Sequence, residues 1–149
     1  MYLPDPFDVT CPSCGHETAC KHSDLLALQA HCAVCGIPFE ELGREMRRGG
    51  NESRMYYIKV HALIELEDRL GREIDMEESP KDATVRDFIA AVAELIGRDR
   101  DDAELTGWVI EAMARLAERP VSTADLDRVC LALFATYPEE VPPGQRADS

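Results

Sequence analysis

Two copies of a short cysteine motif constrain this chain more than any other feature. The sequence CPSCG occupies residues 11–15 and CAVCG occupies residues 32–36, with seventeen residues between the two cysteine pairs. Two residues between paired cysteines allow one tight turn to aim both sulfurs at a single cation, and a second such turn completes a tetrahedron of ligands. The spacing therefore predicts a structural metal site with the ligands Cys11, Cys14, Cys32 and Cys35.

The chemistry of the ligands indicates the metal. Four thiolates suit a zinc ion at a sulfur–metal distance of about 2.3 Å, and iron is the runner-up because tetrahedral sulfur coordination suits both metals. A catalytic zinc keeps one position open for water or substrate, and four cysteines leave none. Each cysteine pair is followed by a glycine, which can adopt the positive φ of a turn that closes around a metal. We therefore expect one structural zinc ion.

Two other uses of the cysteines fit the sequence less well. The first residues lack the basic and apolar segments of a signal peptide, so we expect a cytoplasmic protein, where disulfide bonds are rare. A redox motif of the thioredoxin type needs one cysteine pair between a strand and a helix, whereas this chain has two matched pairs.

Four further side chains near the motif can bind zinc: Cys20, His16, His22 and His31. Any of them could replace a cysteine, because both thiolate and imidazole are zinc ligands. We expect Cys20 to be a spare thiol and the three histidines to lie in solvent or beside the sulfurs.

The cysteine segments resemble the two knuckles of a zinc ribbon. The resemblance rests on VTCPSCGH at residues 9–16 and AHCAVCG at residues 30–36, and it covers about residues 7–42. It implies two short β-hairpins fixed by zinc, with the four motif cysteines as ligands. It implies no particular function, because zinc ribbons serve many. Between the knuckles, residues 23–29 read as a helical turn opened by Ser23.

The rest of the chain reads as helices. Residues 38–48 predict a short helix that ends at Gly49-Gly50-Asn51, and this glycine-rich segment predicts a joint. Hydrophobic periodicity predicts four more helices, at about residues 53–71, 84–96, 105–119 and 122–137. Thr84 and Asp87 resemble a capping box at the start of the second of these, and Pro138 stops the last.

The apolar faces of these helices define the expected core. We predict core positions at Val60, Leu63, Ile64 and Leu70, at Val85, Phe88, Ile89, Val92 and Ile96, at Leu105, Trp108, Val109, Ala112 and Leu116, and at Leu126, Val129, Cys130, Leu133, Phe134 and Tyr137. Because no long segment alternates with period two, we expect no sheet beyond the ribbon. The predicted fold is a small zinc-ribbon module followed by an all-α bundle of about four helices.

This pattern also predicts the division of the chain into domains. We expect a zinc ribbon plus short helix over residues 1–48, a linker over 49–52, an acidic helical bundle over 53–138 and a flexible tail over 139–149.

Part of the helical region resembles the latter half of an acyl carrier protein. The resemblance covers about residues 60–96 and rests on LEDRLGREI at 66–74 and DATVRDF at 82–88. Carriers of that family attach their prosthetic arm to a serine at the start of the acidic helix. The matching positions here are Met55-Tyr56-Tyr57, so the resemblance implies a shared helical layout without a carrier's attachment site.

Charge limits the partners that this chain can bind. The sequence has 29 acidic and 16 basic side chains, with a net charge of −13. Residues 1–50 carry −3 and the remaining residues carry −10. Such a chain repels phosphate backbones and anionic membranes. A local basic stretch nevertheless keeps nucleic-acid binding open as an alternative: Arg44, Arg47, Arg48, Arg54 and Lys59.

No sequence motif in this chain indicates catalysis. The chain contains neither GxxxxGK[ST] nor GxGxxG, and its one histidine outside the cysteine region, His61, is expected at the helix surface. We therefore expect a non-enzymatic zinc protein that acts as a protein-interaction or regulatory adaptor. We expect its partner to be a protein with a basic surface, and we expect no binding to membranes. The alternative is a nucleic-acid-binding or transcription-associated protein that uses the basic stretch from Arg44 to Lys59. An enzyme, or an acyl-carrier-like helper without a prosthetic group, is the remaining reading.

Overall fold

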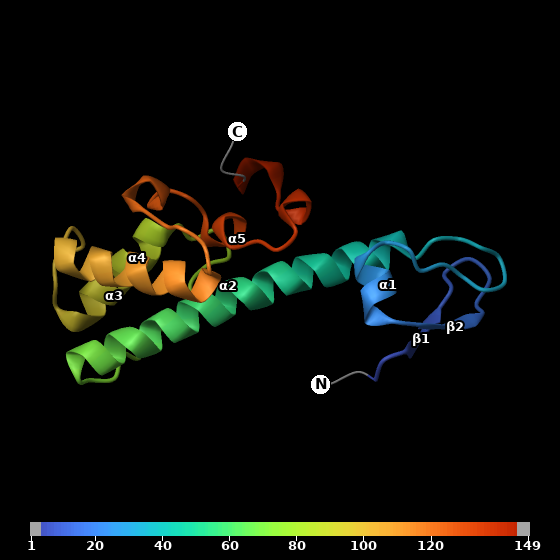
Figure 1. Cartoon of the computed structure of the whole chain (residues 1–149), viewed down its shortest axis with the longest axis horizontal. Coiled ribbons are helices and arrows are strands. Elements are labelled where there is room, and N and C mark those ends of the chain that lie inside the picture. Colours follow the sequence, from blue (N-terminus) through green and yellow to red (C-terminus); the bar gives the residue numbers. More distant parts are fainter. Residues whose placement is uncertain (1–3, 146–149) are drawn as a thin grey trace. The chain divides into compact units, whose positions relative to one another are not determined.

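The computed structural model describes residues 4–145, and its contacts divide the chain into two compact units, Met1–Gly50 and Asn51–Ser149. The first unit contains the strands β1 (Phe7–Thr10) and β2 (Glu17–Cys20), the short helix α1 (His22–Leu26) and the beginning of helix α2 (Glu40–Leu70) (Figure 1). The second unit contains the rest of α2 and every later helix. A small two-stranded hairpin beside a cysteine cluster is thus followed by a mostly helical region, as predicted.

The strands of the first unit form one hairpin. They pair antiparallel, with Phe7 opposite Cys20 and Thr10 opposite Glu17, so the first cysteine motif lies in the hairpin's turn. The second motif lies in a loop that is closed by the single bridge between His31 and Pro38. One of the two predicted hairpins is therefore a strand pair, and the other is reduced to one bridge.

Helix α1 forms where a helical turn is expected, but it begins differently. Lys21 is its N-cap and makes no side-chain capping bond, so the prediction that Ser23 opens the helix is wrong. Packing positions the helix instead, because Leu25 is completely buried. Leu28 adopts a φ of 59° just after the helix, and Arg47 Nε donates to the carbonyl oxygen of Leu26 at 2.7 Å. That bond satisfies one of the acceptors that a helix end leaves open.

Helix α2 runs without interruption through the predicted joint, so the expectation of a helix end at residues 49–51 is wrong. A glycine inside a helix costs only about 1 kcal/mol relative to alanine, which packing can offset. Asn51, expected in a linker, is a buried helix residue at 2% exposure. Its amide donates to the carbonyl of Tyr137 at 2.9 Å and accepts from the backbone N–H of Tyr137 at 2.8 Å.

The buried face of α2 also differs from the expected one. The predicted position Ile64 is 44% exposed, and Val60, Leu63 and Leu70 are only partly buried. The residues that enter the core follow a neighbouring stripe of the same helix: Met55, Ile58, Ala62 and Leu66. His61 is half-buried, and its ring lies 4.2 Å from that of Tyr57.

The next two helices confirm the sequence pattern. Helix α3 (Val85–Ile96) begins with the expected capping box between Thr84 and Asp87 and ends at Gly97, which has a φ of 75°. Helix α4 (Ala103–Ala117) is capped by the side chain of Asp102. Their predicted core positions are buried or packed against the core, including Trp108, whose ring centroid lies 5.4 Å from the guanidinium carbon of Arg69.

The predicted fourth helix is wrong as a continuous element. The segment instead holds a 3-10 turn, η1 (Thr123–Asp125), and a short helix, α5 (Cys130–Leu133). Between them, the carbonyls of Leu126 and Arg128 accept hydrogen bonds from the N–H groups of Arg86 (2.8 Å) and Val85 (3.1 Å). These donors belong to the first turn of α3 and have no partner within their own helix. These bonds hold the segment in a turn and an isolated bridge, between Thr84 and Val129, instead of a continuous helix.

The end of the described chain has a buried anchor. The turns η2 (Pro138–Glu140) and η3 (Pro143–Gln145) flank Val141, which is 2% exposed. The expectation of a flexible tail over residues 139–149 is therefore wrong at Val141, while residues 146–149 lie outside the described part of the chain.

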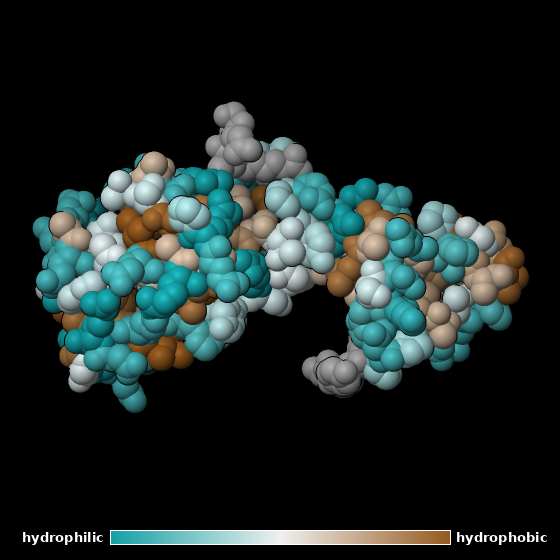
Figure 2. Space-filling view, viewed as in Figure 1, coloured by the Kyte–Doolittle hydropathy of each residue, from teal (hydrophilic) through white to brown (hydrophobic). Residues whose placement is uncertain are grey.

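One apolar cluster forms the core of the helical unit, and Cys130 is completely buried in it as expected. On the face that Figure 2 shows, hydrophilic residues predominate over this unit, with hydrophobic patches between them. None of the helices within residues 4–145 combines the length and the hydrophobicity needed to cross a bilayer.

Candidate metal centre

The two cysteine loops bring four sulfur atoms together. The Sγ atoms of Cys11, Cys14, Cys32 and Cys35 all lie within 4.8 Å of one another. Cys11 Sγ lies 3.6 Å from Cys35 Sγ, and Cys14 Sγ lies 3.6 Å from Cys32 Sγ. None of the six cysteines forms a disulfide bond. The structure thus places the four predicted ligands in one cluster.

The repeated sequence folds into two matching turns. In each turn the N–H of the first cysteine donates to a carbonyl five residues later, that of His16 or Ile37, at 2.9 Å. In each, the N–H of the following glycine donates to the carbonyl of the first cysteine at 3.0 Å. Gly15 and Gly36 both have a φ of 78°, a conformation that favours glycine.

Backbone amides point at the sulfur of the first cysteine in each motif, Cys11 and Cys32, which we call the inner sulfurs. Cys11 Sγ accepts from the N–H groups of Ser13 and Cys14 at 3.4 and 3.5 Å. Cys32 Sγ accepts from those of Val34 and Cys35 at the same two distances. Hydrogen bonds to the charged form of a ligand stabilise it and orient it toward a metal. Both turns are therefore built to hold a thiolate.

The inner pair of cysteines is acidified by these bonds. The N–H of Cys14, more than any other group, lowers the pKa of the Cys11 thiol. The N–H of Cys35 is likewise the largest influence at Cys32, whose pKa is lowered to about 6. Both side chains are nearly inaccessible, at 2% and 1% exposure. The two buried sulfurs therefore favour the charged form that metals bind.

The outer pair, Cys14 and Cys35, has the opposite tendency, because the pKa of each thiol is raised overall. The N–H of His16 lowers the pKa of Cys14, but the neighbouring thiol of Cys32 and burial outweigh it and raise that pKa to about 11. At Cys35 the N–H of Ile37 also lowers the pKa, and burial and the thiol of Cys11 raise it overall. Each sulfur–sulfur contact thus joins one acidic and one weakly acidic thiol. A cation must displace the protons of the outer thiols, so metal binding releases protons.

The cluster fits a single tetrahedral ion. Four sulfurs at about 2.3 Å from a central metal are about 3.8 Å from one another, and the two measured sulfur–sulfur contacts are 3.6 Å. Four thiolates would fill every position, which leaves no site for substrate. The four cysteines can therefore hold one metal ion with the closed geometry of a structural site.

The other candidate ligands lie apart from this cluster. Cys20 is buried at 4% exposure, its Sγ donates to the carbonyl of Thr18, and burial raises the pKa of its thiol. His22 lies 3.3 Å from a carboxylate oxygen of Asp5 and against the ring of Phe7. His31 Nδ1 lies 3.3 Å from the carbonyl of Gln29, and His16 is exposed. Among the described residues, none of these four belongs to the group of sulfurs that can share an ion.

One connection between the two turns could not be predicted. The hydroxyl of Thr18, in β2, accepts from the N–H of Ala33 at 3.1 Å. Because Ala33 lies between the cysteines of the second motif, this bond ties that motif to the hairpin. No sequence pattern marks Thr18 for this role, because the two residues are fifteen positions apart.

The basic stretch from Arg44 to Lys59 does not present a row of isolated cations. Arg44 pairs with Glu40 at 2.8 Å, and Arg48 pairs with Glu41 at 3.0 Å. In the helical unit, Arg54 donates to the carbonyl of Ala117 at 2.9 Å. Lys59 is buried at 7% exposure. Together with Arg47, these side chains mainly engage acceptors of their own chain.

No known family model, curated protein or solved structure matches this chain.

Proposed function

We propose that this protein is a non-enzymatic adaptor in which one zinc ion, held by the four cysteines, shapes a loop that docks on a partner protein. The observation that carries this proposal is the exposure of two apolar side chains on the second cysteine loop. Val34 is 64% exposed and Ile37 is 37% exposed. Figure 2 shows hydrophobic residues at the end of the first unit where Figure 1 places the cysteine loops.

The loop that carries these residues is held firmly. Val34 lies between the two cysteines of its motif, and its own N–H donates to Cys32 Sγ at 3.4 Å. The carbonyl of Ile37 accepts from the N–H of Cys32 at 2.9 Å. A loop whose backbone is fixed before binding loses less conformational entropy on docking. Apolar residues that are both exposed and preorganised are typical of a protein-binding surface.

The charge of the helical unit supports a basic partner. Residues 51–149 carry a net charge of −10. Complementary charge raises the association rate and disfavours wrong partners. The same charge opposes binding to a phosphate backbone, and the arginines near the start of α2 are engaged by Glu40, Glu41 and the carbonyl of Leu26. Protein binding is therefore better supported than nucleic-acid binding.

A crosslinking experiment in the native host tests this proposal. A Val34→Ser, Ile37→Ser double variant is expected to lose partners that the wild-type protein captures, while it keeps its metal content. Leu95→Ser is the matched control, because Leu95 is a 45% exposed apolar residue of helix α3. Equal capture by the wild type and the double variant would contradict the proposal. So would retention on DNA at low salt that disappears when Arg44, Arg47 and Arg48 are changed to glutamate.

A further inference from the structure

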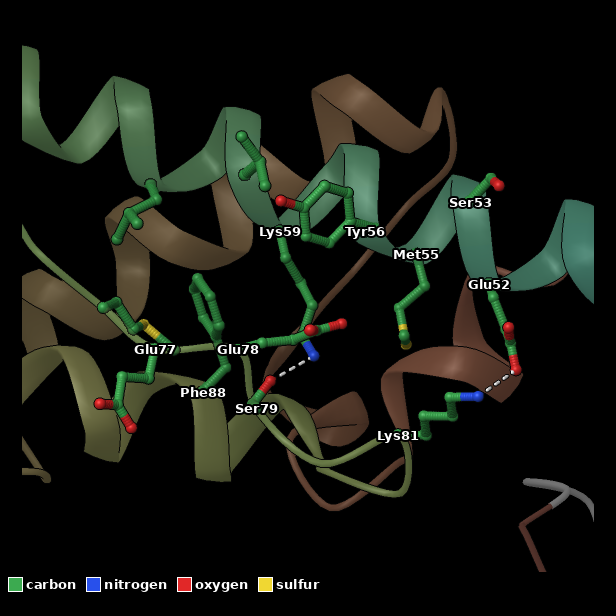
Figure 3. Close-up of a pocket in the computed structure, with 13 residues that line it drawn as sticks. Glu52, Ser53, Met55, Tyr56, Lys59, Glu77, Glu78, Ser79, Lys81 and Phe88 are labelled. Atoms are coloured by element: carbon green, nitrogen blue, oxygen red, sulfur yellow. Dashed lines mark hydrogen bonds and ion pairs between the residues drawn. The ribbon is translucent and has the colours of Figure 1, made fainter. Parts of the chain in front are cut away.

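The helical unit contains a pocket that the proposed adaptor function does not use. It lies between helix α2 and residues 76–81, has a volume of about 330 Å³ and is closed on one side by Phe88 (Figure 3). This volume is at the lower end of the range for small-molecule sites, about 300–1,000 Å³. The apolar part of its lining consists of Met55, Tyr56, Val60, Leu63, Met76 and Phe88.

One buried cation lies in this lining. Lys59 extends from α2 into the pocket, and its Nζ donates to the hydroxyl of Ser79 (Figure 3). The residue is only 7% exposed. Within residues 4–145, no carboxylate forms an ion pair with it. A buried ammonium with only a hydroxyl as its partner is costly, because most of its hydration is lost and no opposite charge replaces it.

The other charges of the pocket do not supply that counterion. Glu52 is paired with Lys81 at 2.9 Å, at the other end of the pocket. Glu77 and Glu78 are exposed at its rim. These two carboxylates disfavour a multiply charged anion such as phosphate at the entrance, and one ammonium and one hydroxyl match the two oxygens of a single carboxylate.

We propose that this pocket binds a small monocarboxylic acid with an apolar body. Its carboxylate accepts hydrogen bonds from Lys59 Nζ and Ser79 Oγ, and its apolar body packs against Met76 and Phe88. Such a ligand supplies the counterion that Lys59 lacks and fills the apolar walls at the same time. The inference is independent of the metal centre and of the adaptor function, because every residue of the pocket belongs to the helical unit.

Calorimetry on the zinc-loaded chain of 149 residues tests the proposal with phenylpropionate as the probe and phenylpropionamide as its neutral analogue. The wild type is expected to bind the acid at least tenfold more tightly than the amide. Lys59→Met keeps the length of the side chain, removes its charge and is expected to abolish this preference. Lys81→Met is the matched control at the pocket rim, and it is expected to keep the preference.

A second measurement guards against a variant that fails to fold. Lys59→Met removes a buried charge, so its melting temperature without ligand is expected to be at least that of the wild type. Phenylpropionate is expected to raise the melting temperature of the wild type but not that of Lys59→Met. Equal affinity for acid and amide, an unchanged preference in Lys59→Met, or no binding of the acid at millimolar concentration would each overturn the proposal. One further result would overturn the small-molecule assignment. It is a peptide ending in phenylalanine that binds more tightly than phenylpropionate when its carboxyl terminus is free, and loses that affinity when the terminus is blocked.

Discussion

Gly43 of helix α2 packs directly against the carbonyl oxygen of Leu25 in α1. A Cβ atom at position 43 would overlap that oxygen and would lie 2.7 Å from Cδ2 of Leu28. The absence of a side chain therefore allows the two helices of the first unit to touch through their backbones. The close approach buries Leu25 beside Cys11, Cys20 and Cys32, in the small core of this unit.

Substitution of this glycine is expected to destabilise the first unit. Gly43→Ala should lower its free energy of unfolding by about 1–3 kcal/mol, because a backbone oxygen cannot move aside as a flexible side chain can. Helices intrinsically prefer alanine to glycine by about 1 kcal/mol. This preference opposes the destabilisation, but it is smaller than the upper part of the expected range of about 1–3 kcal/mol. Denaturant unfolding of the zinc-loaded protein, followed by a probe in the first unit, measures the effect.

Gly49→Ala is the matched control in the same helix. Nothing lies within 4 Å of a Cβ atom at position 49, so this variant should be neutral or up to about 1 kcal/mol more stable. If Gly43→Ala stabilised the unit as much as Gly49→Ala does, the backbone contact between α1 and α2 would be absent.

The buried amide of Asn51 is expected to hold residues 137–141 onto the rest of the helical unit. Asn51→Ala removes both side-chain bonds to the backbone of Tyr137, whose carbonyl keeps the N–H of Glu140 as a second donor, and should cost about 1–3 kcal/mol. Ser53→Ala, at an exposed position of the same helix, should change stability by less than about 0.5 kcal/mol. Hydrogen exchange at Tyr137 and Val141 reports the local effect. Unchanged protection there in Asn51→Ala would show that other contacts anchor the segment.

Cys130 is expected to make the stability of the helical unit depend on alkaline pH. Burial is the main cause that raises the pKa of its thiol from 9.0 to about 11; Asp87 raises it further and Lys59 lowers it. Because the folded state keeps the proton more tightly than the unfolded state, the stabilisation is complete below pH 9 and is lost as the pH rises toward 11. The loss amounts to at most about 2–3 kcal/mol.

Urea unfolding of the wild type and of Cys130→Ala at several pH values between 7.5 and 10.5 isolates this effect. Other groups also titrate in this range, so the informative quantity is the difference between the two slopes. The wild type should lose stability more steeply above pH 9. Parallel declines would mean that the thiol of Cys130 ionises as easily in the folded state as in the unfolded chain.

Local signals in the sequence predicted the helices that depend on local contacts. The capping box of Thr84 and Asp87 and the apolar stripe that follows it lie within a few residues of one another, and α3 forms as predicted. The break in the predicted fourth helix depends instead on bonds that the first N–H groups of α3 donate to the carbonyls of Leu126 and Arg128, some forty residues later. Partners at that separation leave no periodic trace in a single sequence.

The same distinction applies to the candidate site. The spacing of the cysteines predicted that their four sulfurs meet, and the structure brings them together in a cluster that could hold a metal ion. The bond from Ala33 to Thr18 and the contact of Gly43 with Leu25 depend on how separate elements pack. Lys59 was counted in a basic stretch, yet its neighbours in sequence give no sign that the helix turns it inward, toward Ser79.

Elemental analysis of the purified, reduced protein tests the central claim most directly, which is that four cysteines hold one structural zinc ion. The wild type and Cys20→Ser should each contain one zinc per chain, and Cys32→Ser should contain none. Hydrogen exchange of the strand residues Phe7–Thr10 should speed up in Cys32→Ser, while exchange in α3 should remain unchanged. A wild-type protein that is free of metal, yet keeps these strand amides protected, would contradict the account.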